Sequence, residues 1–272
     1  MSTREYIIWS PPYTHTSGGI SVLHYLCHLL NEGGYSAYIS SAGNPSWNEK
    51  GISRVDLDKK MKEGAIAVYP EIVKGNPYNS QRVVRWVLYL PGVIGGDKEY
   101  DPSEAVFCYD ARFCDAAKSD RLFAVDIDEC TEFIDKGNPR KGNLLWVGKG
   151  RDMKRSVVQV PVKEITYGEP KTRAELVDWY NGAELLYSFD NMTRVINEAR
   201  LCGCPVRLYP RQGEELKLQH SKYGIATNDN EIQFAKDTVH MYREYYLAWR
   251  ESLEKQFLDF VMLTQGDELW QR

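Results

Sequence analysis

Short apolar runs alternate with stretches of helical periodicity along the first half of this chain. Apolar side chains between residues 20 and 30 recur at three- and four-residue steps, which predicts a helix that ends at the Asn31-Glu-Gly-Gly34 turn. The apolar runs around it are short and end at turn residues such as Pro70 and Pro91, as buried strands do. The predicted strands are 6–9, 35–39, 65–69, 83–90, 106–109 and 122–125. Strands that alternate with helices favour an α/β fold with parallel sheets covered by helices.

The second half repeats this pattern and adds a long helix at its end. The predicted strands are 144–147, 164–167, 185–189 and 206–209, and the predicted helices are 173–180 and 193–201. Thr172 and Glu175 have the spacing of a capping box at the first of these helices. One apolar stripe at helical spacing runs through the tail and predicts a helix packed on a core: Val239, Tyr242, Tyr246, Trp249, Leu253, Phe257 and Phe260.

The polar segment 136–143 is the best candidate for a linker, because it is rich in turn residues and no apolar residue interrupts it. We therefore predict an N-terminal α/β domain over 1–137, a second α/β domain over 138–240 and a terminal helix over 241–272.

The composition is typical of a soluble globular protein, with 43% hydrophobic and 26% charged residues. The net charge of −4 disfavours a nucleic-acid partner without excluding one. No apolar run approaches the ~20 residues of a membrane-spanning helix, and the first residues lack the apolar region of a signal peptide. Six scattered cysteines form no Cys-x-x-Cys pair, so we predict reduced thiols and a cytoplasmic protein.

The segment 187–206 contains the clearest candidate site. A predicted strand ends at the carboxylate of Asp190, and the helix that follows carries a second carboxylate, Glu198, before Gly203 ends it. Eight helical residues rise about 12 Å, so the two carboxylates cannot hold one atom. They are instead placed to hold the two ends of an extended ligand at the carboxyl edge of a sheet, where open α/β folds bind their ligands.

The first backbone N–H groups of this predicted helix lie between the two carboxylates, at Asn191, Met192 and Thr193. Such groups have no partner within the helix and lie at its positive end, which suits a phosphate. A nucleotide sugar has this layout, with phosphate between two hydroxyl-bearing rings. An ordinary strand–helix unit, with Asp190 as N-cap and Glu198 facing solvent, fits the spacing equally well.

The residues from Asp190 to Val206 resemble the C-terminal half of retaining glycosyltransferases of the GT-B fold. That family has a Glu-x7-Glu motif and then an Ala-Met-Ala-Cys-Gly-x-Pro-Val type run, where this chain has Asp190-x7-Glu198 and Ala199-Arg-Leu-Cys-Gly-Cys-Pro-Val206. The resemblance implies two Rossmann-like domains that face each other across a cleft, with the acceptor side in the first and the donor in the second. It implies that the terminal helix crosses back to the first domain. It also implies that Glu198 holds the ribose hydroxyls and that Asp190, one methylene shorter than the family's Glu, faces the donor sugar.

Gly18 and Gly19 resemble the Gly-Gly loop with which these enzymes cap the donor phosphate from the first domain. Glycines let the backbone approach a ligand closely, and the N-terminus of the following helix favours an anion. A plain turn explains the pair equally well.

Gly148 ends the first predicted strand of the second domain, and basic residues follow it. The resemblance implies that Lys149 takes the place of the family's Arg, and that Arg155 or Lys154 takes the place of its Lys, with both cations binding the pyrophosphate. Cations there stabilise the charge that builds on a departing diphosphate. Tyr167 lies at the end of the next strand, where the family contacts the nucleobase. A solvated basic loop is the simpler alternative for the cations.

The implied activity is transfer of a sugar from a nucleoside diphosphate sugar to an acceptor hydroxyl, with retention at the anomeric carbon. Asp190 and Lys149 are the candidate catalytic residues. The donor is a co-substrate, so we expect no cofactor and no bound metal. The acceptor is a glycan or another compound with a hydroxyl group.

Three alternatives stay open. Asp126-Ile-Asp128 follows an apolar run, and a pair of this kind at a strand end holds a divalent metal in glycosyltransferases of the GT-A fold. A non-catalytic homologue that binds nucleotide sugars would also explain the substitution at Asp190, and a nucleotide-sugar epimerase shares the architecture. His24 and His28 have the i, i+4 spacing of metal ligands, but no third ligand is evident, so helix packing is favoured.

Overall fold

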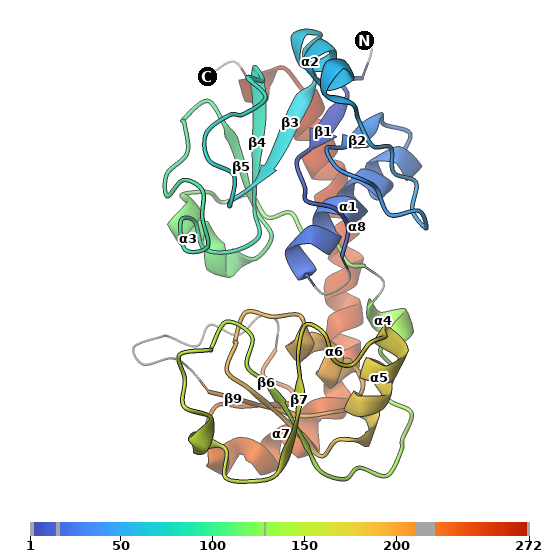
Figure 1. Ribbon diagram of the computed structural model, residues 1–272, viewed down its shortest axis with the longest axis vertical. Helices are drawn as coiled ribbons and strands as arrows, with labels where there is room; N and C mark the ends of the chain where they lie inside the picture. Colours follow the sequence, from blue (N-terminus) through green and yellow to red (C-terminus); the bar gives the residue numbers. More distant parts are fainter. Residues whose placement is uncertain (1–2, 15–16, 128, 210–220, 271–272) are drawn as a thin grey trace. The chain divides into compact units, whose positions relative to one another are not determined.

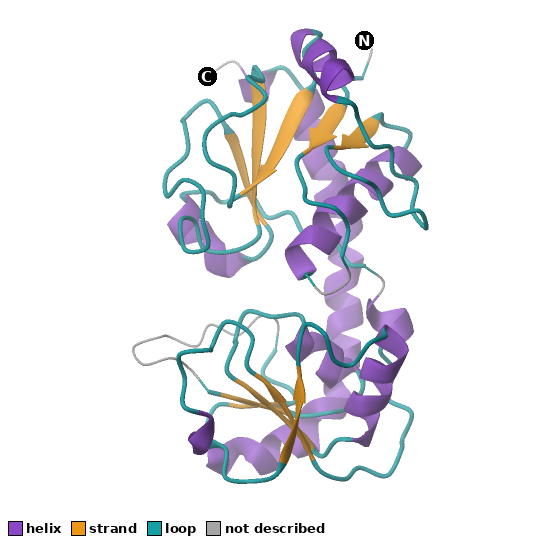
Figure 2. Ribbon diagram, in the orientation of Figure 1, coloured by secondary structure: helices purple, strands orange, loops and turns teal. Residues whose placement is uncertain are grey.

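The computed structural model describes residues 3–14, 17–127, 129–209 and 221–270. The chain divides into two compact units. Unit 1 comprises Met1–Ile127 and Ser252–Arg272, and unit 2 comprises Asp128–Glu251. Each unit has its own parallel sheet and its own helices (Figures 1 and 2).

The sheet of unit 1 has five parallel strands in the order β2-β1-β3-β4-β5. The strands are β1 (Tyr6–Ile8), β2 (Ala37–Ile39), β3 (Ile66–Pro70), β4 (Arg82–Val87) and β5 (Ala105–Cys108). The helices of this unit are α1 (Gly18–Glu32), α2 (Arg54–Lys62), α3 (Cys114–Ala117) and the C-terminal part of α8 (Tyr242–Gln265). Short 3-10 turns are η1 (Ala111–Phe113) and η5 (Glu268–Trp270).

Alternating side chains cover the two faces of this sheet, because successive residues of a strand point to opposite sides. Tyr6 and Ile8 belong to the core with α1 and with Phe260 of α8, whereas Ile7 between them belongs to the core with Leu57 of α2. Nearly every strand residue is therefore apolar, as in a parallel sheet buried on both faces.

The sheet of unit 2 also has five parallel strands, in the order β10-β9-β8-β6-β7. The strands are β6 (Asn143–Trp146), β7 (Val162–Ile165), β8 (Leu185–Ser188), β9 (Val206–Leu208) and β10 (Ile225–Ala226). The helices are α4 (Glu129–Glu132), α5 (Arg173–Gly182), α6 (Val195–Leu201), α7 (Ile232–Thr238) and the N-terminal part of α8. Short 3-10 turns are η2 (Arg155–Val157), η3 (Asp229–Glu231) and η4 (Val239–Met241).

Helix α8 supplies core side chains to both units. Tyr242 and Tyr246 are buried in the core of unit 2 with residues of β6, α5 and α6. Phe260 and Val261 are buried in the core of unit 1 with residues of β1, β4 and α1. The apolar stripe of the sequence therefore supplies side chains to two separate cores.

The units divide at Ile127 and Asp128, earlier than the predicted linker 136–143. Phe133 is buried in the core of unit 2, and Arg140 donates to the carbonyl groups of Tyr180 and Cys202. The polar composition of this segment reflects a surface loop that is tied to unit 2 by hydrogen bonds. In the described part of the chain, no helix is both long and apolar enough to cross a bilayer.

Buried tyrosines predict loss of stability in alkali. Burial raises the pKa of Tyr6, Tyr69 and Tyr180 above the usual value of a phenol. Above about pH 10 the unfolded chain releases phenol protons that the folded chain keeps, so the free energy of unfolding falls as pH rises. We expect a slope of up to about 1.4 kcal/mol per pH unit for each such tyrosine, measured by urea unfolding at increasing pH. The fall of the unfolding free energy with pH is expected to be less steep in Tyr69→Phe than in the wild type. An equally steep fall would show that the phenol of Tyr69 does not contribute to it.

Candidate functional site

The carboxyl ends of the neighbouring strands β6 and β8 bring Lys149 and Asp190 together. Both strands run parallel, so the residues that follow them meet at one edge of the sheet. The backbone N–H of Lys149 lies 3.2 Å from Asp190 Oδ2, and its ammonium lies 3.3 Å from the same oxygen. The ammonium also donates to the carbonyl oxygen of Met192 at 3.0 Å. The side chain of Asp190 is buried, whereas that of Lys149 is about one-third exposed. The ammonium of Lys149 is therefore accessible from solvent, and the carboxylate of Asp190 is not.

Gly148 is required at the base of this pair. Its φ is +50°, in the left-handed region that L residues rarely adopt. A Cβ at this position would lie 2.5 Å from Asp190 Oδ2 and 2.5 Å from the indole nitrogen of Trp146. The missing side chain therefore lets the Asp190 carboxylate pack directly over the backbone after β6.

The loop after β8 holds Asp190 in a fixed orientation. The Ser188 hydroxyl donates to the carbonyl oxygen of Asp190 at 2.8 Å. The N–H of Met192 donates to Asp190 Oδ1 at 3.1 Å, which forms a local turn. The prediction of a helix from Thr193 is wrong at its start, because α6 begins only at Val195. The N–H of Met192 is thus already bonded to the side chain of Asp190. The sequence predicted instead that this N–H is available to a phosphate.

Trp146 and Tyr167 lie beside the same carboxylate. Their rings meet edge to face with centroids 5.3 Å apart. The side chain of Tyr167 is half exposed, and burial together with the nearby charge of Asp190 raises the pKa of its phenol. Tyr167 thus belongs to the site around Lys149 and Asp190, whereas Trp146 was not assigned there from the sequence. Its place as the last residue of β6, two residues before Gly148, was the available signal.

Glu198 lies on α6 and is almost completely buried. The Tyr180 hydroxyl donates to Glu198 Oε2 at 3.3 Å, and the guanidinium of Arg194 lies 3.1 Å from Glu198 Oε1. The contacts of Glu198 are therefore with its own unit, and no contact joins it to Asp190.

Arg155 lies in η2 and is largely exposed. Its guanidinium binds Glu164 of β7 through two hydrogen bonds, at 2.6 and 2.9 Å. This fork-shaped pairing is the geometry that a guanidinium also offers to phosphate. The structure brings Arg155 to Glu164 and not to the pair formed by Lys149 and Asp190.

Gly18 and Gly19 belong to unit 1, where they form the first turn of α1. The helix was predicted from Ile20 but begins two residues earlier, because Ser17 is the N-cap and its hydroxyl accepts from the N–H of Ile20. A Cβ at Gly19 would meet only Leu88 Cδ1, at an ordinary 3.7 Å. The two glycines therefore form the first residues of a helix, where they contribute no side chains, and they do not form a loop.

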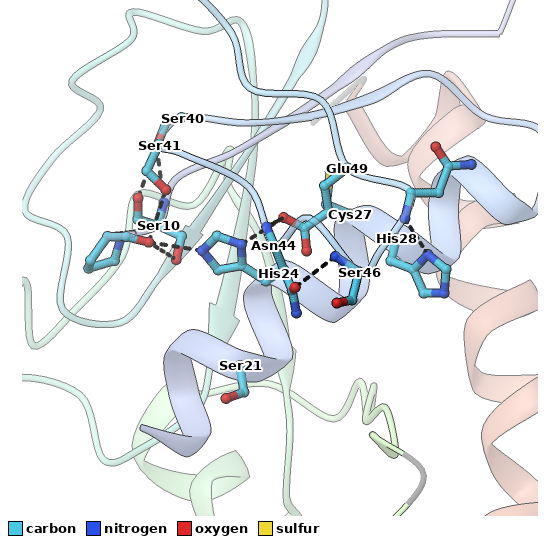
Figure 3. A network of polar contacts seen from close by, with 12 residues as sticks. Ser10, Ser21, His24, Cys27, His28, Ser40, Ser41, Asn44, Ser46 and Glu49 are labelled. Atoms are coloured by element: carbon cyan, nitrogen blue, oxygen red, sulfur yellow. Dashed lines mark hydrogen bonds and ion pairs between the residues drawn. The ribbon is translucent and has the colours of Figure 1, made fainter. Parts of the chain in front are cut away.

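His24 ties α1 to the two loops that follow β1 and β2 in unit 1 (Figure 3). Its Nε2 donates to the carbonyl oxygen of Pro11 at 2.9 Å, and its Nδ1 lies 2.8 Å from Glu49 Oε2. His28 accepts from the N–H of Asn48. Both nitrogens of His24 are thus used in packing, as the sequence analysis favoured over a metal pair.

The acidic pair proposed for the metal-dependent alternative is described only in part. Asp126 is buried in unit 1, and Asp128 lies outside the described residues. The apolar run before the pair forms a single bridge, between Cys108 and Leu122, and no strand. Within the described ranges, no three of the side chains of His, Cys, Asp and Glu are grouped as a metal site requires.

Among known proteins, the chain has no match in sequence and only weak similarity to solved structures. No family model matches the chain, and no curated protein matches it. An α-glucosyltransferase solved with UDP and a 13-mer DNA containing an HMU base is 10% identical over 98% of this chain and 97% of its own, with a TM-score of 0.46. A second structure of an α-glucosyltransferase, with UDP and a 13-mer DNA containing a central A:G mismatch, is 10% identical over 98% and 97%, with a TM-score of 0.45. Sucrose-phosphate synthase from Thermosynechococcus elongatus is 11% identical over 97% of this chain and 96% of its own, with a TM-score of 0.45.

Proposed function

We propose that this protein transfers a glycosyl group from a nucleoside diphosphate sugar to an acceptor hydroxyl, at the edge formed by β6 and β8. The observation that carries the proposal is the pair of Lys149 and Asp190, 3.3 Å apart above Gly148, which has no side chain. A cation held at a sheet edge suits a diphosphate, and a carboxylate beside it suits the hydroxyl groups of a sugar. The resemblance of the segment 190–206 to glycosyltransferases supports the same chemistry.

The transfer breaks the bond between the anomeric carbon and the diphosphate oxygen and forms a bond to the acceptor oxygen. The diphosphate leaves with the bonding electrons, and its charge grows in the transition state. Lys149 is fixed by Asp190 and by the carbonyl of Met192, so its ammonium needs little reorganisation to stabilise that charge. The acceptor proton passes to a phosphate oxygen of the leaving group, so no protein base is needed.

The resemblance of the sequence assigns roles to four other residues. In unit 2, Arg155 binds a phosphate by leaving Glu164, and Tyr167 contacts the nucleobase. Gly18 and Gly19 lie at the start of α1 in unit 1, and only the resemblance assigns them to the diphosphate. These roles come from the resemblance of the sequence, and each is a proposal for mutagenesis.

The finer proposals are retention at the anomeric carbon and independence of metal. Lys149 supplies the positive charge that a metal otherwise supplies. We expect turnover to be unchanged in EDTA, measured as release of the nucleoside diphosphate, with product configuration read by NMR. Loss of activity in EDTA that Mg²⁺ or Mn²⁺ restores would favour the alternative that uses Asp126 and Asp128.

The proposed function is tested by binding and turnover together. UDP, GDP and dTDP, and then UDP-glucose, GDP-mannose and dTDP-glucose, are titrated by calorimetry, and hydrolysis or transfer is followed in parallel with a panel of acceptors. Binding with transfer supports the proposal. Binding without turnover on any acceptor indicates a binding protein, sugar isomerisation without acceptor indicates an epimerase, and binding of none of the six overturns the proposal.

Glu198→Ala is expected to weaken binding of the nucleotide sugar about tenfold if Glu198 holds the ribose, because a charged hydrogen-bond partner is lost. The same change removes the acceptor of the Tyr180 hydroxyl and the partner of Arg194, so the unfolding temperature is expected to fall. Tyr180→Phe is the control, since it disturbs the buried contact and keeps the carboxylate. Equal affinity in the wild type and Glu198→Ala would leave Glu198 a purely structural role.

A further inference from the structure

Trp146 carries a buried hydrogen-bond donor without a partner. The residue is only 6% exposed at the end of β6, and its Nε1 makes no hydrogen bond to any residue that the structure describes. The indole nitrogens of two other tryptophans do have partners: Trp86 donates to the carbonyl of Phe123, and Trp270 to that of Thr264. Buried indole N–H groups normally find a partner, because an unpaired one lowers stability.

The unpaired donor faces the candidate site. The position that a Cβ of Gly148 would fill lies 2.5 Å from Trp146 Nε1 and 2.5 Å from Asp190 Oδ2. The distance from Trp146 Nε1 to Asp190 Oδ2 is therefore at most the sum of these two distances. Even so, the two atoms form no hydrogen bond with each other. Atoms this close can share one oxygen at hydrogen-bonding distance, and because Trp146 Nε1 is buried, neighbouring groups shift to admit that oxygen.

The chemistry of the two flanking groups defines what bridges them. Trp146 Nε1 only donates, and the ionised carboxylate of Asp190 only accepts. A group that accepts from one and donates to the other at the same time carries an O–H: a hydroxyl of the ligand, or a water that such a hydroxyl replaces. A phosphate oxygen has no proton to donate and is repelled by the carboxylate, so the diphosphate belongs on the Lys149 side of Asp190.

We propose that Trp146 and Asp190 together bind one hydroxyl group of the transferred sugar, so that Trp146 is a specificity-determining residue of the donor site. This rests on the proposed function. The hydroxyl accepts from the indole N–H and donates to Asp190 Oδ2. The ring of Tyr167 packs edge to face against the same indole. The sugar is thus held next to the cation that binds its diphosphate, and donors without that hydroxyl are rejected because the N–H is again left unpaired.

Trp146→Phe tests this inference, because it removes the N–H and keeps an aromatic ring. The probes are UDP-glucose, GDP-mannose and dTDP-glucose, each against its parent nucleoside diphosphate, titrated by calorimetry into wild type and variant. We expect the best-bound nucleotide sugar to lose about tenfold in affinity, and its parent nucleotide to change less than about twofold. An equal loss for both, or no loss for the sugar, would overturn the inference.

Monodeoxy analogues of the same donor, each lacking one ring hydroxyl, give a second measurement that does not depend on how the variant folds. The wild type is expected to lose about tenfold for one analogue, and Trp146→Phe is expected no longer to discriminate against that analogue. Equal binding of every analogue by the wild type would contradict the proposal. If no nucleotide sugar binds the wild type, the proposed function fails and this inference with it; if they bind and Trp146 makes no difference, only the inference fails.

Trp86→Phe is the matched control for stability. Its N–H is bonded to Phe123 at 2.8 Å, so the unfolding temperature is expected to fall more in Trp86→Phe than in Trp146→Phe without ligand. A larger fall in Trp146→Phe would mean that its N–H already has a partner in the free protein, which would also overturn the inference.

Discussion

Lys149→Met is expected to lower kcat/KM for the nucleotide sugar by about 10²–10³-fold, the usual effect of removing one preorganised group that stabilises transition-state charge. Methionine keeps the length and apolar stem of the side chain and removes only the ammonium. Asp190 keeps its contacts with the N–H groups of Lys149 and Met192, which belong to the backbone. The loss is therefore expected in turnover far more than in folding, and steady-state kinetics with a thermal melt measure both.

Lys136→Met is the control for the change in net charge. Lys136 lies in the same unit, is about half exposed and pairs with Asp178 of α5, and it precedes β6 instead of following the end of a strand. Its replacement is expected to leave kcat/KM within about twofold, as surface ion pairs contribute little. Equal kinetics for Lys149→Met and the wild type would remove Lys149 from the mechanism and with it the main support for the proposed function.

The strands were predictable because both sheets are parallel and buried on both faces. In β1, β3 and β8 the apolar residues are consecutive, and the structure confirms these three predictions to within one residue at every end. The run 122–125 had the same appearance but makes only a bridge at Leu122. Its residues Phe123 and Val125 are apolar because they fill the core of unit 1, not because they join the sheet.

Helix α2 gave little signal in the sequence. Of its nine residues only Leu57 and Met61 are buried, and most of the others are charged, so the apolar positions are too few for a clear period. The helix is fixed at its start by Ser53, whose hydroxyl accepts from the N–H of Asp56. Side-chain capping and one packed turn, rather than a long apolar face, specify this element.

The meeting of Lys149 and Asp190 followed from topology, because the ends of adjacent parallel strands share one edge. Two features of the site depend on side-chain geometry that spacing does not give. Arg155 pairs with Glu164, nine residues further along the chain. The carboxylate of Asp190 accepts from the N–H of Met192, and α6 begins only at Val195.

Gly148→Ala is expected to reduce kcat/KM by about 10²-fold and to lower the unfolding temperature. The φ of +50° costs an L residue about 1–2 kcal/mol, and the added Cβ would lie 2.5 Å from both Asp190 Oδ2 and Trp146 Nε1. Either the carboxylate or the indole then moves, and a displacement of about 1 Å at a reacting group costs about that factor in rate. Kinetics and a thermal melt on the purified variant give the two effects separately.

Gly168→Ala is the matched control, because it is the same substitution at the residue after Tyr167. A Cβ there meets nothing within 4 Å, and Gly168 is not among the residues with positive φ. Activity and unfolding temperature are expected to stay at wild-type values. If Gly148→Ala lowered stability but left kcat/KM unchanged, Asp190 and Trp146 would be packing residues, and the reacting sugar would have to bind elsewhere on the chain. If Gly168→Ala were as inactive as Gly148→Ala, the loop after β7 rather than the base of the Asp190 pair would control turnover.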